Sequence, residues 1–147
     1  MARVVKRARA GTHGGVAALT VDELLAEARA GIDRLDPAAA HAALSDGAVL
    51  VDIRSEVQRA RDGDVPGAVA IARNVLEWRC DPASPDRDTR IGGHETRLVL
   101  LCDEGYQSSL AAATLQRLGF TRATDVVGGF QAWRAAGLPV SCASGPS

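Results

Sequence analysis

The sequence predicts an α/β fold: one domain with a central parallel sheet and helices on both faces. Apolar runs that suit buried strands alternate with helical segments, and these runs are continuous, as in strands covered on both sides. The chain has 147 residues, 46% hydrophobic and 24% charged. Such a chain can bury a core that needs no disulfides. We expect a domain over residues 19–140, with its core at 32–140.

The first half of the domain contains two helix starts with clear capping signals. Thr20 and Glu23 form a capping box, and the helix that they start can end at Gly31. After a short extended piece, Asp36 followed by Pro37 starts a second helix, which runs to residue 44.

Strands and later helices follow from apolar runs bounded by turn residues. Residues 81–93 are polar and rich in Pro and Gly, which indicates a surface loop. A helix capped by Ser108 or Ser109 is expected to end at Gly119, and a last helix at 130–136 follows a Gly-Gly turn. The expected strands cover residues 49–53, 65–71 (after a turn), 98–101 and 124–127.

Charge is unevenly distributed along the chain. Residues 1–18 carry four basic and no acidic side chains, whereas the remainder carries 13 basic and 18 acidic ones. A mildly acidic body argues against a nucleic-acid-binding surface, and no apolar run approaches the length of a membrane span. We therefore expect neither nucleic acid nor a membrane as partner, with a basic solvated tail over 1–18 and a C-terminal tail over 141–147.

The three cysteines indicate free thiols. Their number is odd, they show no CxxC spacing, and no histidine lies at a zinc-finger distance, so neither a disulfide framework nor a metal site is indicated. Unpaired thiols are typical of a reducing compartment, which predicts a cytoplasmic protein. No metal or organic cofactor is expected. Cys142 is expected to be exposed in its polar tail, and Cys80 to be a bystander.

Cys102 has the position at which a parallel α/β sheet places its ligands. It ends a predicted buried strand, and ligands bind beyond the carboxyl ends of such strands. A helix begins after a short loop, and the free amides and positive dipole end of a helix favour a thiolate. Gly105 allows this loop to turn its amides inward as an anion cradle. The alternative is that Cys102 is only a small buried hydrophobe.

The histidines do not point to a hydrolase. His13 lies in the expected tail, His41 in an alanine-rich helix and His94 in a glycine-flanked loop. A Cys-His nucleophile pair is therefore weakly supported. A thiolate that transfers sulfur needs no such base, because the attacked sulfur carries a good leaving group.

Residues 102–108, Cys-Asp-Glu-Gly-Tyr-Gln-Ser, resemble the active-site loop of the rhodanese (thiosulfate sulfurtransferase) family, Cys-x-x-Gly-x-Arg-Ser. Four further segments resemble family features in the family's order. They are the Asp-x-Arg strand end at Val51-Asp52-Ile53-Arg54, the Pro-Gly-Ala turn at Val65-Pro66-Gly67-Ala68, the Gly-Gly-x-x-x-Trp signature at Gly128-Gly129 and Trp133, and the closing segment Leu138-Pro139-Val140. The ordered set covers about residues 32–140.

The resemblance implies a single-domain sulfurtransferase. The Cys102 thiolate would take a sulfane sulfur from a small donor (thiosulfate or a persulfide) or from a persulfidated protein, hold it as a persulfide, and pass it to a thiol or cyanide. Asp52, in a structural role, and Arg54 would organise the strand end beneath the loop. The substrate and anion-binding loop would comprise Asp103, Glu104, Gly105, Tyr106, Gln107 and Ser108.

The loop departs from the family pattern in its charge. Gln107 stands where the family usually has Arg, and Asp103 and Glu104 add two acids. A unit charge 4 Å away is worth about 4 kcal/mol at an effective dielectric of 20, before desolvation and screening reduce it. These changes disfavour a dianion such as thiosulfate, so we expect a persulfide to be the better donor.

Two arginines could offset this loss of positive charge. Arg73 and Arg79 follow a predicted strand and could lie at the same rim as the loop. The alternative is that they pair with Glu77 or Asp81 on the surface.

Two other classes of function compete with this one, and the first is not supported. Related phosphatases and arsenate reductases grip phosphate with an arginine that follows the cysteine, but here Gln107 and Ser108 occupy the corresponding region, and neither offers an arginine fork. The serious rival is a catalytically weak rhodanese-like module for protein interaction or sulfur carriage. The lost loop arginine favours that module, whereas the intact Cys102 disfavours it.

Overall fold

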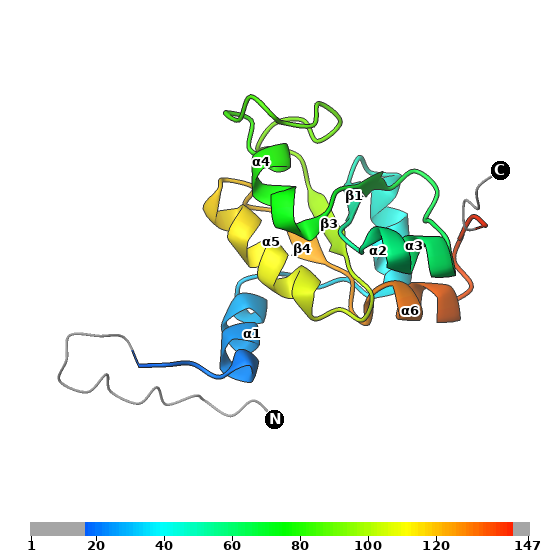
Figure 1. Cartoon of the computed structure of the whole chain (residues 1–147), viewed down its shortest axis with the longest axis horizontal. Helices are drawn as coiled ribbons and strands as arrows, with labels where there is room; N and C mark the ends of the chain where they lie inside the picture. The colour runs from blue at the N-terminus through cyan, green and yellow to red at the C-terminus, as the bar shows by residue number, and fades with distance from the viewer. Residues whose placement is uncertain (1–16, 143–147) are drawn as a thin grey trace.

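The computed structural model describes residues 17–142 of the chain. Almost all of the expected basic tail, and all but two residues of the C-terminal tail, lie outside this range. In the described part the helices are α1 (Val21–Ala30), α2 (Pro37–Leu44), α3 (Glu56–Asp62), α4 (Leu76–Cys80), α5 (Gln107–Arg117) and α6 (Gly129–Ala135), with a 3-10 turn η1 (Arg73–Val75) (Figure 1). The strands are β1 (Val49–Asp52), β2 (Val69–Ala70), β3 (Leu98–Leu101) and β4 (Thr124–Asp125).

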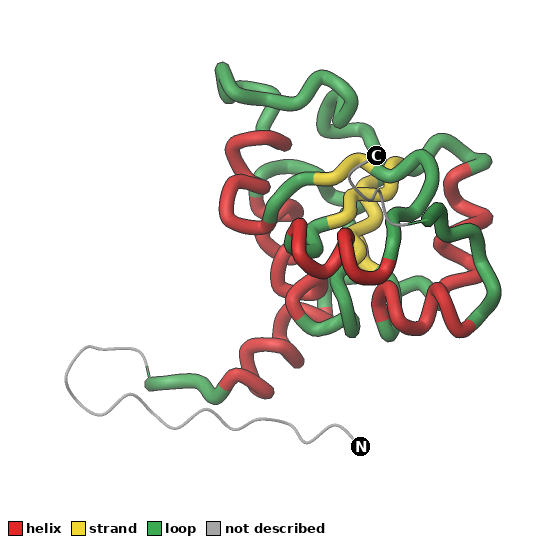
Figure 2. The backbone as a smooth tube through the Cα atoms, turned by 45° about the vertical axis from the view of Figure 1, so that its right-hand side comes forward, coloured by secondary structure: helices red, strands yellow, loops and turns green. Residues whose placement is uncertain are grey.

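The four strands form one parallel sheet in the order β2-β1-β3-β4. Figure 2 shows the strands in the middle of the molecule with helices around them. The predicted α/β fold is therefore confirmed. No helix in the range 17–142 is long and apolar enough to cross a membrane.

The continuous apolar runs place side chains on both faces of the sheet. In β3 the buried side chains alternate: Leu98 and Leu100 pack into one core with α4 and α5, whereas Val99 and Leu101 pack into the other core with α2 and α6. Each face of the sheet has a core of its own, because successive residues of a strand point to opposite faces. Of the three largest fully buried side chains, Trp133 and Phe130 come from α6 and Phe120 follows α5.

The parallel register brings the carboxyl ends of β1 and β3 to the same edge. Asp52 is paired with Leu101, so the residues that follow each strand emerge side by side. Cys102 and Arg54 are therefore neighbours in space although they lie far apart in the sequence. Several of the buried polar side chains, among them Asp52 and Arg54, lie at this edge.

Two helices were not expected from the sequence. Helix α3 begins at a capping box between Ser55 and Gln58, whose side chains each accept the other's backbone N–H at 3.1 Å. Helix α4 buries only Leu76 and Cys80 and is too short to show a helical period. The short capping signal at Ser55 was present in the sequence and could have been found.

Asp52 and Arg54 form a buried ion pair at the end of β1. Arg54 Nη2 lies 2.7 Å from Asp52 Oδ2 and also donates to the Gly63 carbonyl at 2.9 Å. The guanidinium carbon stands 3.7 Å from the centre of the Phe130 ring. These contacts give both side chains a structural role, since each charge has its partner inside the fold, although the buried Arg54 Nη1 has no hydrogen-bond acceptor in the part of the chain that the structure describes.

We expect Arg54→Met to lower the free energy of unfolding by about 3–5 kcal/mol, because Asp52 would remain buried without its cation. The matched control is Arg61→Met, which breaks an ion pair whose arginine is 57% exposed and is expected to cost much less stability, because exposed ion pairs contribute little. Urea denaturation followed by circular dichroism measures both. Equal losses in the two variants would contradict a structural role for the buried pair.

Candidate active site

Cys102 directly follows β3, and its sulfur accepts two backbone N–H groups. Gly105 N lies 3.1 Å and Ser108 N 3.3 Å from Cys102 Sγ. The Cys102 thiol also donates a hydrogen bond to Ser108 Oγ at 3.2 Å. The chain between the strand and α5 thus curls around the sulfur, and the side chain is buried at 5% exposure.

Helix α5 supplies further N–H groups beside the sulfur. It begins at Gln107, with Tyr106 as the preceding residue, and the first N–H groups of any helix lack partners within that helix. Among the described residues, the N–H groups of Tyr106 and Gln107 have no acceptor. They are therefore available to an additional atom bound at the sulfur.

Helix α6 holds the same loop from its other side. Phe130 N donates to the Cys102 carbonyl at 2.8 Å, and Gln131 N donates to the Asp103 carbonyl at 3.1 Å. This approach requires Gly129, because a Cβ there would stand 2.5 Å from the Cys102 carbonyl oxygen. The Gly-Gly part of the signature thus lets the start of α6 reach the backbone of the cysteine loop.

Ser108 and Ser109 do not cap α5, contrary to the sequence prediction. They lie in its first turn, and each hydroxyl donates to Asp125 Oδ2 at 2.7 Å. The carboxylate of Asp125, which is fully buried at the end of β4, accepts both O–H groups and so holds the first turn of α5 against the sheet. Arg34 Nε in turn donates to Asp125 Oδ1 at 2.8 Å.

Two arginines that sequence reasoning missed bind the back of the loop. Arg29 Nη2 donates to the Gly105 carbonyl at 2.7 Å, and Arg34 Nη2 donates to the same oxygen at 2.9 Å. No local pattern marks either arginine. Asp125 was missed as well, because the strand predicted at 124–127 placed it inside the strand, whereas β4 ends at Asp125.

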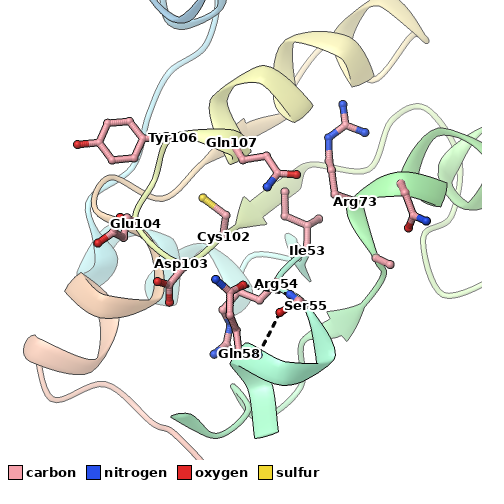
Figure 3. Close-up of a pocket in the computed structure, with 12 residues that line it drawn as sticks. Ile53, Arg54, Ser55, Gln58, Arg73, Cys102, Asp103, Glu104, Tyr106 and Gln107 are labelled. Atoms are coloured by element: carbon pink, nitrogen blue, oxygen red, sulfur yellow. Dashed lines mark hydrogen bonds between the residues drawn. The ribbon is translucent and has the colours of Figure 1, made fainter. Parts of the chain in front are cut away.

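A cavity of about 470 Å³ opens above Cys102. Figure 3 shows Gln107 and Tyr106 on one side of the sulfur and Arg54 on the other. Of the residues predicted for the site, Cys102, Asp103, Glu104, Tyr106, Gln107, Arg54 and Arg73 line the cavity. Gly105, Ser108, Asp52 and Arg79 are not among its lining residues.

The two arginines that line this cavity already have carboxylate partners. Arg54 is bonded to Asp52, and Arg73 Nη1 donates to both carboxylate oxygens of Glu77 at 2.9 and 3.1 Å. Arg79, away from the cavity, donates to the Asp86 carbonyl at 2.8 Å and lies 3.5 Å from Asp88. Arg73 therefore lies at the cavity and is also paired with Glu77, so both alternatives expected from the sequence hold for it. Arg79 is paired away from the cavity.

The two acids of the loop behave differently. Asp103 accepts a hydrogen bond from Gln131 Nε2 at 2.9 Å and lies 4.0 Å from an Arg61 nitrogen. Glu104 is exposed at the cavity rim, as are Tyr106 and Gln107. The mouth of the cavity thus carries negative charge and neutral polar groups.

The remaining thiols and histidines lie outside the cavity lining. Cys142 is exposed as predicted. Cys80 is buried, and burial raises the pKa of its thiol to about 12. The described histidines, His41 and His94, stack edge-on against Trp133 and Phe120. Within residues 17–142, no cluster of three or more His, Cys, Asp or Glu side chains is arranged to hold a metal ion.

Residues 36–136 match the model of the rhodanese-like domain family. The chain belongs to this family. The resemblance read from the ordered motifs is therefore confirmed, and the match ends close to the C-terminal boundary expected for the domain. It begins after α1, so Arg29 and Arg34 lie outside the matched segment.

Relatives of this rhodanese-like chain include proteins named as sulfurtransferases. A thiosulfate sulfurtransferase from Pseudomonas savastanoi is 33% identical over 102 residues, 69% of this chain and 87% of the relative. A sulfurtransferase from Allochromatium vinosum is 30% identical over 101 residues, 69% of this chain and 85% of the relative. These similarities support a sulfurtransferase-like role for the chain.

A solved structure from Rhodopseudomonas palustris is similar over most of the chain. It shares 35% identity and a TM-score of 0.77, and the similarity covers 86% of this chain and 98% of that one. That protein is described as one of unknown function and a possible tyrosine phosphatase. The rhodanese-like fold is thus shared with a protein whose own activity is open.

We expect Gly129→Ala to destabilise the protein by about 1–3 kcal/mol more than Gly137→Ala, because an added Cβ at residue 129 overlaps backbone. Both glycines have positive φ, 62° and 75°, so both variants incur the left-handed cost of about 1–2 kcal/mol. A Cβ at residue 137 meets nothing within 4 Å. Urea denaturation gives the difference, and equal destabilisation would mean that the loop and α6 do not need this close approach.

Proposed function

We propose that the protein is a sulfurtransferase that carries sulfane sulfur as a persulfide on Cys102. The observation that carries this proposal is the convergence of the Gly105 and Ser108 N–H groups on Cys102 Sγ at the base of an open cavity. Backbone N–H groups stabilise an anionic sulfur without a counter-charge. The free N–H groups of Tyr106 and Gln107 would serve the outer sulfur of the persulfide.

The proposed reaction consists of two displacements at sulfur. The Cys102 thiolate attacks the outer sulfur of a donor R–S–SH, the donor's S–S bond breaks, and RS⁻ leaves with the electron pair while Cys102 becomes Cys–S–SH. An acceptor thiolate then attacks the outer sulfur, takes it with its proton, and releases the Cys102 thiolate. No net oxidation occurs, and neither step needs a metal, an organic cofactor or a histidine base.

The charge of the cavity supports a persulfide donor, either small or on a protein, over thiosulfate. Its arginines are matched by carboxylates, whereas Asp103 and Glu104 add negative charge at the mouth. A dianion would have to approach against this charge with Gln107 as the only replacement for the family's loop arginine. A persulfide carries at most one charge, spread over sulfur, which N–H dipoles can stabilise.

Phosphatase activity has no comparable support. Transfer of a phosphoryl group requires a fork of charged donors around three oxygens. In this loop Ser108 directs its hydroxyl to Asp125, and Gln107 provides a neutral amide. The interaction module remains the second candidate, because the exposed Tyr106 and Glu104 could contact a partner without any transfer.

Treatment with glutathione persulfide is expected to add one sulfur atom to the protein at Cys102. The experiment uses intact-mass measurement and peptide mapping in a Cys142→Ser background, since Cys142 is the exposed thiol. Cys102→Ser is the matched control and should gain nothing. Subsequent addition of a thiol should return the original mass. Failure of the Cys142→Ser protein to gain sulfur would favour the interaction module.

Gln107→Arg is expected to raise kcat/KM for thiosulfate by at least about tenfold, because a cation near the sulfur contributes more than 1.4 kcal/mol even after screening. Gln107→Met, which removes the amide without adding charge, should not raise it. Steady-state assays with thiosulfate and with glutathione persulfide measure both variants. A wild-type preference for thiosulfate would overturn the proposed donor, and an unchanged Gln107→Arg would assign anion binding to Arg73.

A further inference from the structure

The Gly105 carbonyl is held by two arginines from outside the segment that matches the family. Arg29, on α1, and Arg34, in the link that follows α1, both donate to this oxygen, at 2.7 and 2.9 Å. Arg29 Nε also donates to Ser109 Oγ at 3.0 Å. Two charge-assisted hydrogen bonds on one carbonyl fix the direction of that carbonyl.

Fixing this carbonyl also fixes an N–H group of the cradle. The peptide bond between Gly105 and Tyr106 is planar and trans, so its C=O and N–H point in opposite directions. With the oxygen turned to the arginines, the Tyr106 N–H is turned away from them. A flip of this peptide would exchange the two and replace the Tyr106 N–H with a carbonyl oxygen.

Gly105 makes this flip of the peptide easier than it would be at any other residue type. The residue has φ 89°, and a Cβ there would stand 2.7 Å from Gly128 N, so the close approach of α6 requires glycine. Glycine is also the residue that changes backbone conformation most easily. The glycine that allows close packing against α6 therefore also leaves the loop backbone less rigid. A contact from outside the loop is needed to hold the Gly105–Tyr106 peptide in one orientation.

Arg29 also places a positive charge behind the sulfur. Its bonds go to a carbonyl and a hydroxyl, whereas Arg34 is bonded to Asp125. Burial and neighbouring Arg34 lower the pKa of Arg29, while Asp125 acts in the opposite direction. Arg29 thus adds a cation next to the backbone of the cysteine loop.

We propose that Arg29 and Arg34 are positioning residues of the Cys102 site, which keep the Gly105–Tyr106 peptide oriented so that the loop N–H groups face the sulfur. Helix α1 then belongs to the site machinery as the carrier of Arg29. No residue of α1 is buried, so its contribution to the core is small. The sulfur-transfer consequence rests on the function proposed above, but the orientation of the loop does not.

Arg29→Gln is expected to slow alkylation of Cys102 by iodoacetamide about tenfold, since a charge-assisted hydrogen bond and a nearby cation are lost together. The rate is measured by peptide mapping across a pH series in the Cys142→Ser background. Arg29→Lys, which keeps a charge and one donor, should recover part of the rate. The control is Arg117→Gln, which removes the same charge from an exposed side chain in the last turn of α5. It should leave the rate unchanged.

A second measurement separates positioning from general destabilisation. Urea denaturation of Arg29→Gln should show less loss of stability than Arg54→Met, while the persulfide formed with glutathione persulfide should decay faster than in the wild type. An alkylation rate and pH profile equal to those of the wild type would overturn the proposal. If the wild type takes up no sulfur, the proposed function fails, and the alkylation series still decides the role of Arg29.

Discussion

Three sets of contacts fix the cysteine loop. The start of α5 directs N–H groups to the Cys102 sulfur, the start of α6 directs N–H groups to the Cys102 and Asp103 carbonyls, and two arginines hold the Gly105 carbonyl. The N–H groups of Gly105 and Ser108 face the sulfur inside the loop, and the carbonyls of Cys102, Asp103 and Gly105 face outward. This division of the peptide dipoles is what makes a short loop into a site for an anionic sulfur.

The buried carboxylate of Asp125 joins the sheet to this arrangement. A buried carboxylate without partners would destabilise the fold. The oxygens of Asp125, however, accept hydrogen bonds from two serine hydroxyls and from the Arg34 guanidinium. Because Arg34 reaches both Asp125 and the Gly105 carbonyl, the strand end and the loop cannot move independently. The ion pair of Asp52 and Arg54 fixes the end of β1, on the other side of β3, so the two strands that flank β3 both end in a buried aspartate that is paired with an arginine.

The sequence predicted the parts of this site that are local or periodic. The buried strand that ends at Cys102, the helix after it and the glycine pair before α6 all follow from short-range patterns. Asp125 could not be found by the strand-end rule, because the strand predicted at 124–127 ran past it, whereas β4 ends at Asp125. Arg29 could not be found either, because its partner Gly105 is 76 residues away and nothing near Arg29 in the sequence distinguishes it from a solvent-exposed arginine on a helix. The expected caps at Ser108 and Ser109 were wrong because α5 begins at Gln107, before both serines, and their hydroxyls donate to a distant carboxylate that no local pattern reveals.

The way in which this site stabilises charge bears on which sulfur it can hold. An arginine in the loop would attract any anion, in proportion to its charge, over several ångströms. Backbone N–H groups act at hydrogen-bond distance, and their effect depends on direction more than on charge. A site that relies on them favours a single charge placed at the sulfur itself, as in a persulfide, over two charges spread on the oxygens of thiosulfate. The acids at the mouth strengthen this preference, because their repulsion is largest for the ion with the larger charge. Such discrimination holds only while the peptides keep one orientation, which makes the arginines behind the loop part of the selectivity as well as of the structure.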